Sequence, residues 1–213
     1  MKVKIDFENN FPTPFSLNGD FDIYVNGFNG CETIKYGKEL SGQTNLLKGL
    51  CHLTEDCDKT IISAFDTDNY GIVKQSVGVF ENGKLLGISD MSVALSDSGY
   101  MPGSGGKLYQ TNTCKIGTAI GDDLFSFDLF KSLATCGAEI IIAVTNFRKK
   151  EINSILIRAY SYLLGIPTLL LYKGGCYVSN VNGELTMPNE NGIYDVEPYT
   201  DFILKTTKIK LKR

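Results

Sequence analysis

The sequence lacks the features that mark membrane, secreted and nucleic-acid-binding proteins. No apolar run approaches the roughly 20 residues that a membrane-spanning helix needs. Residues 1–6 alternate charged residues with Val and Ile, unlike the apolar core of a signal peptide. The formal net charge is −3, so no basic excess favours nucleic acid or an anionic membrane. We therefore expect a cytoplasmic protein with neither a membrane nor a nucleic-acid partner.

Residues that commonly bind metals are also scarce. His52 is the single histidine, and the six cysteines show no CxxC spacing. Structural zinc sites use such residues at short spacings, and disulfide frameworks belong to oxidising compartments. We expect no metal, no cofactor and reduced thiols at all six positions, which are Cys31, Cys51, Cys57, Cys114, Cys136 and Cys176.

Two polar segments have an ordinary structural interpretation beside a functional one. Residues 66–69, Asp-Thr-Asp-Asn, resemble a divalent-cation cluster, but they lie between two predicted strands, where turn chemistry explains them equally well. The basic residues between 205 and 213 alternate with Thr and Ile. This alternation predicts a solvated edge strand over 201–211 rather than a binding tail.

The features that are present indicate an α/β protein. At 213 residues and 43% hydrophobic residues, the chain fits a single domain over 1–213. Asn82-Gly83 and Asn182-Gly183 each predict a type I′ hairpin, because both central residues of that turn take positive φ. Alternating strands and helices with hairpins on both sides predict mixed sheets covered by helices. We expect strands over 2–7, 21–26, 59–66, 70–80, 84–88, 115–120, 138–144 and 166–172, and helices over 38–53, 125–136 and 149–164.

A glycine occupies the most informative position of the chain. The strand that begins at Lys115 runs into a sharp turn at Gly121, and a helix follows. Such a strand-to-helix turn suits a nucleophile, because it holds the side chain at a helix N-terminus. Gly121 has no side chain to react. Asp122 and Asp123, which follow it, favourably meet the helix dipole, and Asp123 is a candidate cap; a catalytic or metal role is the alternative.

Six short segments follow one another in a characteristic order and spacing: residues 82–87 (NGKLLG), 100–103 (YMPG), 116–123 (IGTAIGDD), 133–141 (LATCGAEII), 158–161 (RAYS) and 165–168 (GIPT). In this order and spacing they resemble motifs of the carbon–nitrogen hydrolase (nitrilase) superfamily. The resemblance implies a four-layer αββα sandwich of the nitrilase type with mixed sheets, often dimerised.

The same resemblance implies a site built from Glu, Lys and Cys, which cleaves amides or nitriles through a thioester. The family's cysteine position falls on Gly121 and its lysine position on Met91. Its glutamate position falls near Phe28, where the sequence has no acid. The chemistry needs a thiolate, a carboxylate and an ammonium group together. Three absences predict a non-catalytic relative.

Three hypotheses follow. The favoured one is a non-catalytic protein that binds a small molecule or serves as a homodimeric scaffold. The second is a divergent amidase-type hydrolase with relocated groups, such as Glu32 or a Lys173 amine nucleophile. The third is a structural subunit of a larger complex. Candidate pocket residues are Gly121, Asp122, Asp123, Asn146 and Lys173. The space beneath Gly121 is expected either to hold a metabolite or to be filled by Met91 and Phe28.

Overall fold

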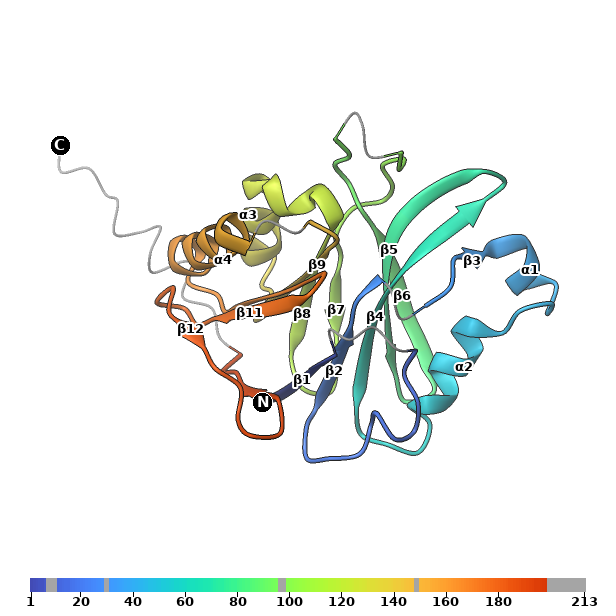
Figure 1. Cartoon of the computed structure of the whole chain (residues 1–213), viewed down its shortest axis with the longest axis horizontal. Helices are drawn as coiled ribbons and strands as arrows, with labels where there is room; N and C mark the ends of the chain where they lie inside the picture. The colour runs from blue at the N-terminus through green and yellow to red at the C-terminus, as the bar shows by residue number, and fades with distance from the viewer. Residues whose placement is uncertain (7–10, 29–30, 96–98, 148–149, 199–213) are drawn as a thin grey trace.

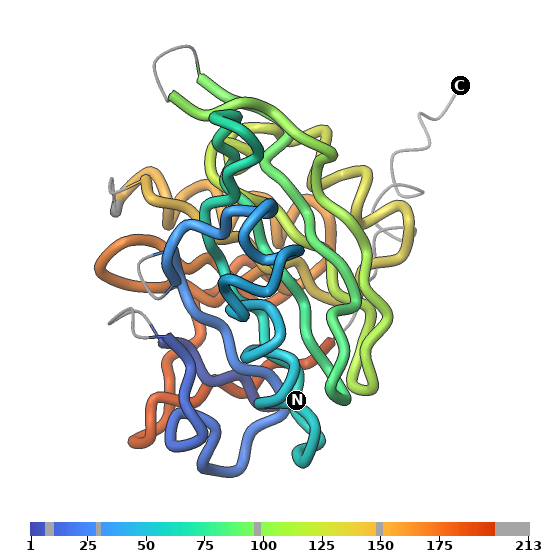
Figure 2. Tube along the Cα trace, turned by 90° about the vertical axis from the view of Figure 1, so that its right-hand side faces the viewer, coloured from blue at the N-terminus to red at the C-terminus, as the bar shows by residue number. Residues whose placement is uncertain are grey.

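Two β-sheets lie face to face, and a helical layer covers the outer side of each (Figure 1). The structure, a computed structural model, describes residues 1–6, 11–28, 31–95, 99–147 and 150–198. Helices α3 (Phe127–Thr135) and α4 (Lys150–Leu164) cover one sheet. Helices α1 (Tyr36–Leu40) and α2 (Leu46–Leu53) cover the other, and Figure 2 shows them in front of its strands. The predicted four-layer αββα sandwich is confirmed.

The first sheet has the order β13-β1-β2-β4-β5-β6, with β3 beside β4. Its members β1, β2, β3 and β4 pair in parallel, whereas β13, β5 and β6 join antiparallel. The sheet is therefore mixed, as expected. Its strands are β1 (Lys2–Asp6), β2 (Ile23–Asn26), β3 (Ile34–Lys35), β4 (Thr60–Asn69), β5 (Ile72–Glu81), β6 (Lys84–Asp90) and β13 (Ile193–Asp195).

The second sheet has the order β12-β11-β10-β9-β8-β7. Its three central strands, β8, β9 and β10, are parallel, and antiparallel strands flank them on both sides. The carboxyl ends of the parallel strands therefore lie along one edge. The strands are β7 (Leu108–Gln110), β8 (Lys115–Ile120), β9 (Ile140–Thr145), β10 (Thr168–Tyr172), β11 (Gly175–Ser179) and β12 (Leu185–Thr186).

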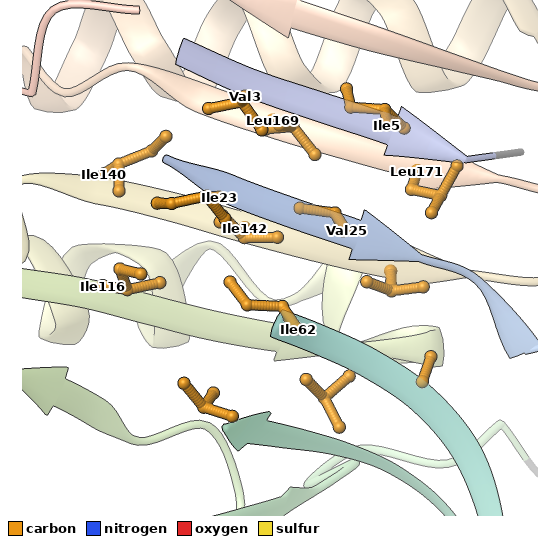
Figure 3. Packing of buried hydrophobic residues seen from close by; sticks show 14 of the residues in the cluster. Val3, Ile5, Ile23, Val25, Ile62, Ile116, Ile140, Ile142, Leu169 and Leu171 are labelled. Atoms are coloured by element: carbon orange, nitrogen blue, oxygen red, sulfur yellow. The ribbon is translucent and has the colours of Figure 1, made fainter. Parts of the chain in front are cut away.

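Aliphatic side chains fill the space between the two sheets (Figure 3). Successive residues of a strand point to opposite faces, so Ile142 contacts this core while Ile141 packs toward α3 and α4. Every residue of β9 and β10 is buried. Burial on both faces explains why these strands are continuous apolar runs rather than alternating ones.

The first helical layer differs from the prediction. The expected helix over 38–53 is wrong, because two short helices replace it and the segment 41–45 separates them. Gly42 lies in this break with φ +73°, a conformation outside the helical region. The helix expected from 125 begins at Phe127, since residues 121–125 form a 3-10 helix, η2.

Two turns also differ from expectation. Residues 66–69 belong to β4 rather than to a turn, and the chain reverses at Tyr70 and Gly71 instead, with φ of 53° and 89°. The Asn82-Gly83 turn is confirmed, since both residues have positive φ. At the second hairpin only Gly183 does, and a bond from Asn180 N–H to Glu184 O closes a longer loop. The type I′ prediction is wrong there.

The remaining expectations concern the thiols, the tail and membrane segments. All six cysteines are unpaired, and all lie in the described part of the chain. The strand expected over 201–211 lies outside the described residues. Among the residues that the structure describes, no helix is both long and apolar enough to cross a membrane.

Candidate functional site

The site begins at the turn that follows β8. Gly121 opens η2 (Gly121–Phe125) with φ +58°, a backbone conformation that strains residues carrying a Cβ. A Cβ built here would overlap Oε1 of Gln75 and approach Sδ of Met91 to 2.5 Å. The turn therefore has the predicted sharp geometry, but its centre is already occupied by side chains from the other sheet.

Met91 supplies one of these side chains. It follows β6 directly and is completely buried. Its thioether sulfur accepts a hydrogen bond of 3.2 Å from the Asp122 N–H. The sequence alignment placed the family's lysine here, and a neutral thioether supplies no positive charge for an oxyanion. Phe28, the other residue expected to fill this space, is half-buried against the inter-sheet core.

Gln75 supplies the other side chain, and the sequence analysis missed it. It lies on β5, opposite Asp66 of β4 in the antiparallel register. Ala64 and Val77, two residues away along each strand, belong to the inter-sheet core. Asp66 and Gln75 therefore face the space between the sheets. A polar residue in an apolar strand was the only local sign of Gln75, and its contact with Gly121 comes from the packing of the sheets.

Asp66 and Tyr100 complete the polar part of the site. The Tyr100 hydroxyl donates a hydrogen bond of 3.2 Å to Oδ2 of Asp66. Oδ1 of Asp66 is buried and has no hydrogen-bond partner among the described residues. Burial raises the pKa of Asp66, and the bond from Tyr100 opposes this shift. Burial also raises the pKa of Tyr100, as does the Asp66 charge, while Gln75 opposes the rise.

Asp123 fastens the turn to the segment after β6. Its Oδ1 accepts bonds from Ser92 N–H at 2.8 Å, Ser92 Oγ at 2.6 Å and Val93 N–H at 2.9 Å. Its Oδ2 accepts one from Ile120 N–H at 3.2 Å. Burial nevertheless raises the pKa of Asp123, because desolvation outweighs these hydrogen bonds. The geometry is that of a cap that joins the end of β8 to the segment after β6.

The other candidate residues, Asp122, Asn146 and Lys173, differ in their surroundings. Asp122 accepts a bond of 3.0 Å from Leu95 N–H. Asn146 and Lys173 follow β9 and β10 and are exposed, as is Glu32. The structure thus brings Gly121, Asp122 and Asp123 together in one turn. It leaves Asn146 and Lys173 exposed at the strand ends that share an edge with that turn.

Metal-binding residues do not gather in the described part of the chain. No group of three or more His, Cys, Asp or Glu there could hold a metal ion. His52 is exposed on α2, where it contacts Glu55 at 2.9 Å. Neither residue belongs to the site.

Comparison with known proteins identifies the fold. No family model matches the sequence, and no curated protein matches it. Solved structures do. A carbon–nitrogen hydrolase from Helicobacter pylori G27 superposes with a TM-score of 0.70 at 15% identity, covering 92% of this chain and 88% of its own. Nit3 of Saccharomyces cerevisiae, a member of branch 10 of the nitrilase superfamily, gives a TM-score of 0.74 at 16% identity, covering 100% and 95%.

A third similar structure is an amidase. It is a variant amidase from Nesterenkonia sp. AN1 that carries the product of Michael addition of acrylamide at its active-site cysteine. Its TM-score is 0.73 at 10% identity, covering 99% of this chain and all of its own. This chain has the nitrilase fold. The resemblance that its sequence motifs indicate is confirmed at that level.

Proposed function

We propose that this chain is a nitrilase-fold protein that does not perform amidase chemistry and acts by binding a small molecule. The observation that carries the proposal is the packing at Gly121. Gln75 and Met91 fill the place that a nucleophilic side chain would occupy. The binding region we propose lies beside this plug, where Asp66 and Tyr100 present polar groups between the ends of β4, β5 and the connection after β6.

The reaction implied by the resemblance requires three groups in one site. A thiolate attacks, a carboxylate carries the proton, and an ammonium group stabilises the tetrahedral oxyanion. In our alignment the first and third positions are Gly121 and Met91, and the second falls at Phe28. None of these side chains can carry the corresponding role, so we propose that no thioester forms.

The alternative is a divergent hydrolase of non-peptide C–N bonds with relocated groups. Such a reaction needs a nucleophile and a base within hydrogen-bond reach of each other. Asp122 and Asp123 are already bound to backbone N–H groups. Lys173 and Glu32 are exposed on different loops. These surroundings favour the binding hypothesis over relocated catalysis.

The test is a hydrolysis panel of aliphatic amides, nitriles and N-carbamoyl compounds with purified protein. We expect ammonia release no faster than with a heat-denatured sample. We also expect that Gly121→Cys gains no activity, because the new side chain cannot occupy the turn without displacing Gln75 and Met91. Turnover by the native protein that disappears on denaturation would reject the proposal.

We further propose that the protein is a homodimer. Helix α4 carries four exposed apolar side chains, Ile155 at 64%, Tyr162 at 59%, Leu163 at 55% and Ile152 at 38% exposure. Exposed apolar patches on soluble proteins commonly mark interfaces. Size-exclusion chromatography with light scattering should give twice the mass of the 23.4 kDa chain. The double variant Ile155→Glu/Tyr162→Glu should give the monomer, and a monomeric native protein would reject this proposal.

A further inference from the structure

One carboxylate oxygen of Asp66 is buried and has no hydrogen-bond partner among the described residues. Oδ2 accepts the bond from Tyr100, but buried Oδ1 accepts none from the described residues. No described lysine, arginine or histidine lies within ion-pair distance of the carboxylate. A buried unsatisfied acceptor destabilises a protein by about 1–3 kcal/mol, and by more when it is charged. Such a group calls for an explanation.

The surroundings of Asp66 favour a positive ligand group. Its neighbours Gln75 and Tyr100 are neutral hydrogen-bonding side chains. Beyond Gln75 lies the thioether of Met91. These described neighbours of the Asp66 carboxylate are therefore all uncharged.

Access to the carboxylate does not require opening the sandwich. Asp66 and Tyr100 are both half-buried, and Met101, next to Tyr100, is 56% exposed. Tyr100 lies in the connection between β6 and β7 rather than in a strand. Its side chain can therefore move without breaking strand pairing.

We propose that Asp66 anchors a cationic nitrogen, a protonated amine or an amidine, in a small ligand bound at the carboxyl end of β4. A ligand N–H would donate to Oδ1, while Tyr100 keeps its bond to Oδ2. The charge-assisted bond would satisfy the orphaned oxygen and neutralise the buried charge. This inference rests on the proposed binding function, and it specifies the ligand class.

The test uses n-butylammonium and acetamidinium chloride as probes, with n-butanol and butyramide as neutral controls. Binding is measured by thermal shift and calorimetry at constant ionic strength. The cations should stabilise the native protein, and Asp66→Asn should weaken their binding at least tenfold. Asp68→Asn is the matched control, since Asp68 lies two residues along the same strand and accepts its bond from the Gly71 N–H. It should bind the cations like the native protein.

The outcomes separate this inference from the proposed function. Equal binding of cations to Asp66→Asn and native protein would reject the role of Asp66. Preference for butyramide would reject the cationic class but leave a binding protein. Absence of binding by both cations at millimolar concentration would also reject the inference. Hydrolysis of butyramide would instead reject the proposed function. Circular dichroism of Asp66→Asn verifies that a loss of binding is not a loss of fold.

Discussion

The sulfur of Met91 accepts a hydrogen bond from the backbone N–H of Asp122, 3.2 Å away. Met91 directly follows β6 of one sheet, and Asp122 lies in the turn after β8 of the other sheet. The contact therefore joins the two sheets at the turn that opens η2. The backbone N–H of Asp122 is thus already bonded to the side chain of Met91.

Substitution of Gly121 by Ala should destabilise the fold strongly. The positive φ accounts for about 1–3 kcal/mol, and overpacking against Gln75 and Met91 for about 1–3 kcal/mol more. Urea denaturation measures the change in unfolding free energy. Gly42→Ala is the control, because Gly42 has φ +73° but nothing within 4 Å of its added Cβ. Equal losses in the two variants would show that the space beneath Gly121 is not filled.

Two substitutions by Lys and Leu test the packing of the Met91 side chain. Met91→Lys places an ammonium group in a completely buried position facing an N–H donor. We expect a loss of about 3 kcal/mol or more, because an unpaired buried charge is strongly unfavourable. Met91→Leu keeps the volume and should lose less than about 1.5 kcal/mol. Chemical denaturation compares the two, and a lysine variant as stable as the leucine variant would contradict the described packing.

Removal of the Asp123 carboxylate should release the segment after β6. Asp123→Ala leaves the N–H groups of Ser92, Val93 and Ile120 without their acceptor. Only the Ile120 bond is fully buried, but hydrogen bonds to a charged group contribute about 1.5–3 kcal/mol each, so we expect a loss of at least about 2 kcal/mol. Thermal and urea unfolding measure it. Asp128→Ala, an exposed aspartate in the first turn of α3, is the control and should lose less than about 1 kcal/mol.

Asp66 should make stability depend on pH in an unusual direction. Burial raises its pKa above the ordinary 3.8, so the folded protein holds this proton more tightly than the unfolded chain does. Its contribution is therefore most favourable below 3.8 and decreases as the pH rises through the folded pKa. Asp66→Asn removes this dependence, so its stability relative to the native protein should increase between acidic and neutral pH. Urea unfolding across that range, with Asp68→Asn as control, measures it. Parallel curves for native and Asp66→Asn proteins would contradict the shift.

The sequence predicts those parts of the fold that depend on local chemistry. Asn82-Gly83 forms its turn because both residues accept positive φ, and Gly121 turns for the same reason. The break near Gly42 was not predicted, since apolar spacing alone continues across it. Residues 66–69 were interpreted as a turn because Asp and Asn are common in turns. In the structure, pairing with β5 outweighs this preference.

The composition of the site was harder to predict than the fold. The sequence predicts Met91 as one possible filler of the space beneath Gly121, but it does not identify Gln75, which shares that space. Gln75 reaches Gly121 only because β5 and β8 come from sheets that pack face to face. That contact depends on tertiary packing, which spacing along the chain does not contain. Asp66 was considered only as part of the cluster 66–69, and its place opposite Gln75 was not predicted because it follows from the strand register.

The four bonds to Asp123 have a consequence for how the molecule opens. Ser92 and Val93 lie outside every helix and strand, yet their amides donate to a completely buried carboxylate that also holds Ile120. Local fluctuation cannot free them without separating this segment from the neighbouring sheet. Their hydrogens should therefore exchange with deuterium more slowly than is usual for irregular chain.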